Sequence, residues 1–260
     1  MTFDNLLFEH DGAVAVITLN RPSVLNALNI PLLTDLNRAL TVIENDATVR
    51  ALVLTGAGDK AFAAGADIQE MASLASGEAR GHSTFGQQVF NHIEKLGKPV
   101  IAALNGVALG GGCELALSCT LRVASETARL GQPEINLGLI PGFGGTQRLP
   151  RLIGASRALD LLLTGRIVSA TEAFEMGLIN RVVPSADLLQ TARDLAIELA
   201  AKPPLAARFV LDAVASAAEL SLDRGLQVES ALFGQAANTS DAKEGLAAFL
   251  EKRAPRFTGR

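Results

Sequence analysis

Two glutamates in apolar surroundings are the residues best suited to chemistry in this chain. Glu114 directly follows three glycines at 110–112 and precedes an apolar run, and Glu134 follows Pro133 in a segment that carries no other charge. The helix dipole also favours an acid in a first helical turn, so either glutamate taken alone could be structural. An apolar setting favours the protonated carboxyl, however, so two such acids facing one substrate could act as proton donor and proton acceptor.

Three glycine-containing turns, at 63–67, 110–112 and 141–146, accompany these acids. Glycines often do no more than mark turns. Two of the three turns nevertheless lie between an expected strand and an expected helix, where backbone N–H groups lack intrahelical partners and carry partial positive charge. An anion or a developing oxyanion could approach those N–H groups closely, because no side chain stands in the way.

Other common catalytic motifs do not fit the sequence. The turns at 110–115 and 142–147 lack the third glycine of GxGxxG, no GxxxxGK[ST] occurs, and residues 81–85 fail the last position of GxSxG. His10, His82 and His92 form no HExxH arrangement, and we assign them to ordinary helix or surface positions. Cys113 and Cys119 match no metal-ligand spacing and are expected to be buried small hydrophobic residues. We therefore expect no metal site.

The composition sets wider limits on the function. The 260 residues are 48% apolar, which allows one large domain or two small ones. With 23 basic and 27 acidic residues, the net charge of -4 gives no general attraction to nucleic acid or anionic membranes. The N-terminal segment lacks the features of a secretory signal, and no run of ~18 apolar residues could span a membrane. These features predict a cytoplasmic protein without a membrane-spanning segment.

An alternation of strands and helices must position the glutamates. Apolar, β-branched runs predict strands at 13–19, 51–58, 98–106 and 121–125. Helical spacing predicts helices from Pro31 to about 46, at 110–119, and at 67–95 with breaks near Gly77 and Gly81. This order predicts an α/β architecture with largely buried strands.

The character of the chain changes after Pro184. From about 185 to 253 the sequence is rich in Ala, Leu and Glu, and it predicts three or four helices with breaks at 203–204, Gly225 and Gly234. We therefore divide the chain into residues 1–184, a strand-bearing core that contains the candidate site, and residues 185–260, a helical region.

An ordered set of motifs resembles the enoyl-CoA hydratase (crotonase) family over nearly the whole chain. The motifs lie at 62–67, 105–115, 131–134 and 141–149, with further similar segments at 19–28, 163–165, 173–179 and 244–253. A triple glycine alone would be a weak signal, whereas this ordered set is highly specific. The resemblance implies a spiral of ββα units with a C-terminal helical region that forms a homotrimer, often as a dimer of trimers.

The resemblance also implies roles for individual residues. The backbone N–H groups of Ala66 and Gly111 match an oxyanion hole that holds the thioester carbonyl oxygen. Glu114 matches the glutamate that takes a proton from the attacking water, and Glu134 matches the one that delivers a proton to C2. Gly142 matches a backbone donor near the catalytic water.

Contacts to the acyl-CoA substrate are expected from two parts of the chain. The candidates are Ala64, Asp67, Ile68, Lys60, Phe249 and Lys252. Lys60 is a possible phosphate partner, and Phe249 and Lys252 could close over the adenine end from a neighbouring subunit. An exposed basic position or a helix-packing role explains these three at least as well. Phe143 is bulkier than the alanine often found in its turn, so it could narrow the pocket or pack in the core.

The predicted function is that of a hydro-lyase that reversibly adds water to a 2-trans-enoyl-CoA to give a 3-hydroxyacyl-CoA, as in fatty-acid β-oxidation. No cofactor is expected apart from the coenzyme A that the substrate carries. Relatives that isomerise the double bond commonly keep only the carboxylate matching Glu134, so the presence of Glu114 favours hydration. Two alternatives stay open: another crotonase-superfamily reaction, such as isomerisation or a specialised dehydration, and a catalytically idle binding protein.

Overall fold

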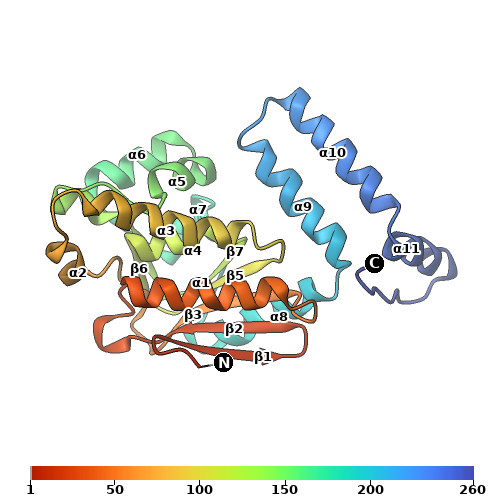
Figure 1. Cartoon of the computed structure of the whole chain (residues 1–260), viewed down its shortest axis with the longest axis horizontal. Helices are drawn as coiled ribbons and strands as arrows, with labels where there is room; N and C mark the ends of the chain where they lie inside the picture. The colour runs from red at the N-terminus through yellow and green to blue at the C-terminus, as the bar shows by residue number, and fades with distance from the viewer. Residues whose placement is uncertain (1) are drawn as a thin grey trace.

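A six-stranded sheet runs through the middle of the protein in the computed structural model, which describes residues 2–260 (Figure 1). Its strands are, in spatial order, β1 (Leu6–Asp11), β2 (Val14–Leu19), β3 (Ala51–Gly56), β5 (Val100–Leu104), β7 (Leu121–Ser125) and β10 (Arg181–Val183). Only β1 and β2 pair antiparallel, and all other neighbours are parallel. The four strands predicted from apolar runs are β2, β3, β5 and β7, which confirms the α/β class.

Side chains of this sheet alternate between two hydrophobic cores, because successive residues of a strand point to opposite faces. In β3, Leu52 and Leu54 join the larger core, whereas Val53 joins the smaller one. The larger core includes residues of α1 (Ile30–Asn45), α3 (Glu78–Glu94) and α4 (Gly111–Ser118), and α8 (Leu188–Ala200) covers the smaller one. A sheet covered on both faces requires continuously apolar strands, and this is the pattern of β3.

A second sheet of very short strands carries the candidate site. It contains β4 (Ala61–Ala63), β6 (Val107–Leu109), β8 (Arg129–Gly131) and β9 (Ile167–Ser169). The pairs β3–β4, β5–β6 and β7–β8 each place one strand in the large sheet and the next strand in the small one. The helix that follows is α2 (Ile68–Ser73) with α3, then α4, then the 3-10 helix η2 (Pro133–Leu137). This repeat confirms the crotonase-like spiral of ββα units that the resemblance implies.

The remaining helices correct three predicted breaks. They are η1 (Pro22–Val24), α5 (Gly145–Ile153), α6 (Ala155–Thr164), α7 (Ala170–Glu175), η3 (Ser185–Asp187), α9 (Pro204–Ala217), α10 (Leu222–Ala237) and α11 (Ser240–Glu251). The break near Gly77 is confirmed. Gly81 lies inside α3, however, and Gly225 and Gly234 lie inside α10. A single glycine costs an exposed helix only about 1 kcal/mol relative to alanine, so it does not have to end one.

The C-terminal helices are arranged in two ways. Helix α8 packs on the large sheet, although the sequence-based division at residue 184 places it with the helical region. Helices α9 and α10 run side by side away from the sheets, with α11 beyond them (Figure 1). Within residues 2–260, no helix combines the length and the apolar character that crossing a bilayer requires.

Candidate active site

Three neighbouring strands of the small sheet end at the candidate site. Strands β4, β6 and β8 pair parallel, so their carboxyl ends meet at one edge. Residues 64–67 follow β4, residues 110–111 follow β6, and residues 132–134 follow β8. Two of the glycine-containing turns and Glu134 are therefore brought together by the parallel pairing of three-residue strands.

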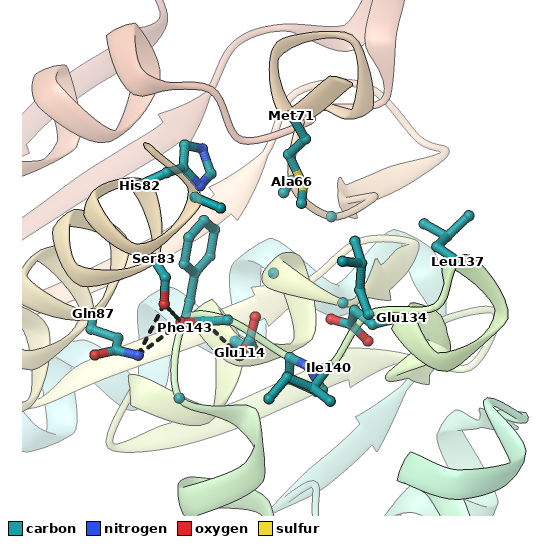
Figure 2. A pocket seen from close by; sticks show the side chains of 18 of the residues that line it. Ala66, Met71, His82, Ser83, Gln87, Glu114, Glu134, Leu137, Ile140 and Phe143 are labelled. Carbon is teal, nitrogen blue, oxygen red and sulfur yellow. Dashed lines mark hydrogen bonds between the residues drawn. The ribbon is translucent and has the colours of Figure 1, made fainter. Parts of the chain in front are cut away.

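These segments surround a cavity of about 640 Å³ (Figure 2). Its lining includes all five residues to which the resemblance gives a catalytic role: Ala66, Gly111, Glu114, Glu134 and Gly142. Ala64 and Ile68, predicted to contact substrate, also line it. The apolar part of the wall comes from α2 and from the segment after η2, through Met71, Leu74, Leu137, Leu139 and Ile140.

Two backbone N–H groups lie next to each other on the cavity wall. A Cβ atom built on Gly111 would stand 3.2 Å from the nitrogen of Ala66. Gly111 is the first residue of α4, so its N–H has no intrahelical acceptor. Within residues 2–260, neither N–H donates to a protein acceptor. Both are thus available to an oxygen atom in the cavity, as an oxyanion hole requires.

Glu114 is held by the third glycine-containing turn. Its side chain is almost fully buried, and Oε1 accepts hydrogen bonds from the N–H groups of Phe143 at 2.8 Å and Gly145 at 2.6 Å. Burial raises the pKa of Glu114 to about 7. The nearby charge of Glu134 adds to this increase, while the N–H of Gly145 and then that of Phe143 oppose it. A carboxyl group with this pKa can accept or release a proton near neutral pH.

Glu134 faces the glycine turn that begins α4. A Cβ on Gly110 would lie 2.8 Å from Glu134 Oε1, and Gly110 has φ +49, a backbone conformation that L side chains rarely adopt. In the amide orientation that satisfies its surroundings, buried Gln132 donates to Oε1 of Glu134 at 3.0 Å and to Oε2 at 3.3 Å. Burial raises the pKa of Glu134, which favours the protonated form that a proton donor needs.

Phe143 combines the two roles left open by its size. Its ring is 3% exposed and packs against His82 and Phe90, with ring centroids 5.4 and 5.5 Å apart, yet the residue also lines the cavity. A Cβ on Gly86 would lie 2.3 Å from this ring, so α3 needs a glycine there. His82, assigned from the sequence to an ordinary helix or surface position, is a buried helix residue of the cavity wall; its nearest carboxylate is Glu70, at 3.5 Å.

The other predicted substrate contacts do not line this cavity. Asp67 caps α2 by accepting from the N–H of Gln69, and it pairs with Arg21 at 3.0 Å. Lys60 is exposed in the loop before β4. Their contacts with substrate stay predictions.

Phe249 and Lys252 lie on or next to α11, at the far end of the molecule from α2 (Figure 1). The structure therefore does not bring them to the cavity of their own chain. Their approach to the site of a neighbouring subunit stays a prediction.

Sequence reasoning missed Ser83 and Gln87, two polar residues of α3 that line the cavity. Both contact the turn that holds Glu114 (Figure 2). A signal existed in the spacing, because Ser83, Gln87 and Asn91 lie four residues apart and so share one face of a helix. Among residues 2–260, no three His, Cys, Asp or Glu side chains are grouped as a metal site would require.

Comparison with known proteins agrees with this geometry. A family model described as enoyl-CoA hydratase/isomerase matches residues 9–260. The chain is 46% identical to a short-chain-enoyl-CoA hydratase of Clostridium acetobutylicum, over 97% of both chains, and 46% identical to a crotonyl-CoA hydratase of Syntrophomonas wolfei, over 99% of both. It also resembles the crystal structure of an enoyl-CoA hydratase from Bacillus anthracis, with a TM-score of 0.96 and 43% identity over 99% of this chain and 100% of that one.

Proposed function

Because this chain belongs to the enoyl-CoA hydratase/isomerase family, we propose that it catalyses the reversible hydration of a 2-trans-enoyl-CoA to a 3-hydroxyacyl-CoA. The observation that carries the proposal is the pair of buried carboxyl groups, Glu114 and Glu134, lining one cavity together with the free N–H groups of Ala66 and Gly111. Relatives named short-chain-enoyl-CoA hydratase and crotonyl-CoA hydratase support a short acyl group.

The proposed mechanism divides the work between the two glutamates. The thioester carbonyl oxygen accepts from the N–H groups of Ala66 and Gly111, which stabilise the charge that develops on it. Ionised Glu114 takes a proton from water as the water oxygen bonds to C3. Protonated Glu134 gives its proton to C2. The pKa of about 7 for Glu114 and the raised pKa of Glu134 support these protonation states near neutral pH.

The direct test is the loss of conjugated-enoyl absorbance when the purified protein meets crotonyl-CoA. We expect saturable hydration, unchanged after dialysis against a chelator, because we propose no metal or other cofactor. Conversion of a 3-enoyl thioester without hydration would instead support isomerisation. Binding of the thioester without turnover would support the idle binding protein.

We also propose that the chain assembles as a homotrimer or a dimer of trimers. Helices α9–α11 support this, because they expose large apolar side chains such as Phe233, Phe249 and Leu250, each more than 70% accessible. Such a surface is costly in water and typically marks a protein interface. We expect light scattering to give three or six times the 27.1 kDa of the chain, and a monomer at micromolar concentration would contradict the proposal. The cytoplasmic location stays a prediction from the sequence.

A further inference from the structure

One peptide carbonyl in the active-site turn accepts two side-chain hydrogen bonds from α3. Ser83 Oγ donates to the carbonyl oxygen of Gly142 at 2.5 Å, and Gln87 Nε2 donates to the same oxygen at 2.9 Å (Figure 2). Gln87 Nε2 also lies 3.2 Å from Ser83 Oγ. The two side chains are one helical turn apart and form a single donor group, called here the α3 clamp.

The clamped carbonyl belongs to the peptide unit that contacts the proposed base. In a planar trans peptide, the C=O of one residue and the N–H of the next point in opposite directions. The carbonyl of Gly142 points to the α3 clamp, and the N–H of Phe143 donates to Glu114 Oε1 at 2.8 Å. One rigid unit therefore links Ser83 and Gln87 to the Glu114 carboxylate.

The turn needs such external support. Gly144 has φ +113, and neither Gly142 nor Gly144 has a side chain that could anchor it. Helix α3 also holds the next carbonyl indirectly: Arg148 donates to the oxygen of Phe143 at 2.8 Å and to Asn91 Oδ1 at 2.6 Å. Hydrogen bonds linked in series polarise one another, so donors on the carbonyl side strengthen the N–H donor on the other side.

We propose that Ser83 and Gln87 are positioning residues for the hydration reaction, because they orient the Gly142–Phe143 peptide so that its N–H holds Glu114 in place as the ionised base. This inference rests on the proposed function. It adds two residues from a helix that contributes neither a catalytic carboxyl group nor an oxyanion donor.

The titration of Glu114 offers a readout specific to the clamp. The titratable and charged groups around it are Glu134 on η2, Arg148 on α5, Cys113 on α4 and His82 on α3. All of them are kept when only the clamp is removed. A weaker N–H donor stabilises the ionised carboxylate less, so loss of the clamp should raise the pKa of Glu114.

The test compares Ser83→Ala/Gln87→Met with Thr84→Ala/Gln88→Met. The control removes one hydroxyl and one amide from the same helix, where Thr84 bonds only within α3 and both side chains are exposed. For the clamp variant we expect kcat on crotonyl-CoA to fall about 10-fold with KM within about twofold. The acidic limb of kcat/KM, expected near pH 7 in the unmodified enzyme, should move up by about half a unit to one unit. Ser83→Thr, which keeps the hydroxyl, should behave like the unmodified enzyme.

Several outcomes would overturn the clamp. These are an unmoved acidic limb, a change confined to KM, or an equal loss of kcat in the Thr84→Ala/Gln88→Met control. The titration of Glu114 can also be followed without substrate, by NMR of ¹³C-labelled glutamate carboxyl groups assigned with Glu114→Gln. This measurement separates the two ideas: a pKa raised by clamp removal in a protein that does not hydrate crotonyl-CoA would support the clamp and reject the proposed function.

Discussion

Glu134→Gln and Glu114→Gln should each reduce the turnover of crotonyl-CoA by about 10²–10⁴-fold, the range typical of losing a general acid or base. Glutamine has nearly the same shape as glutamate but cannot take or give the proton. The fold should survive, because the amide oxygen of a glutamine in place of Glu114 could still accept from the N–H groups of Phe143 and Gly145. The cavity would keep its shape and lose only proton transfer.

Initial rates and circular dichroism, measured on the same samples, test this prediction. Glu126→Gln is the matched control, since Glu126 is exposed in a loop outside the cavity and its replacement should leave the rate unchanged. Near-normal turnover in either folded active-site variant would remove that glutamate from the mechanism. A comparable loss in the control would show that the decrease does not depend on the site.

The sequence allowed prediction of the large sheet but not of the small one. Strands such as β3 have five or six consecutive apolar residues, and burial on both faces leaves that pattern in the sequence. Strands β4, β6 and β8 have three residues each, too few for a recognisable periodicity. Since these short strands bring the oxyanion turns and Glu134 together, the residues alone could not predict the site's geometry. The ordered motifs that resemble the family supplied it.

The site residues divide in a similar way. Glu114, Glu134 and the glycines stand out through local context, because an acid beside a glycine turn in an apolar segment is unusual. Ser83 acts on a carbonyl 59 residues further along the chain, so its role follows from how α3 packs and from no local pattern. Gly81 misled the analysis in the opposite direction, because an exposed glycine costs a helix too little to end it.

Gly112→Ala should reduce kcat by about 10²–10³-fold, the loss typical of removing one oxyanion donor. A Cβ at this position would lie 1.9 Å from the backbone carbonyl oxygen of Ala63, and no rotation of a side chain can relieve that contact. The start of α4 must therefore move away from the end of β4. Because Gly111 begins α4 and Ala66 follows β4, this movement separates the two N–H groups that would hold the thioester oxygen.

The control for this substitution is Gly81→Ala in α3, where an added Cβ meets nothing within 4 Å. Alanine there should stabilise the protein by about 0.5–1 kcal/mol, because glycine is a poor helix former, and it should leave kcat unchanged. Gly112→Ala should be destabilised in the same denaturant titration, although alanine favours a helix at this position too. Unfolding curves and kcat for both variants therefore separate steric displacement from helix propensity. A Gly112→Ala enzyme with unmodified kcat would mean that the spacing of the Ala66 and Gly111 N–H groups does not limit the reaction.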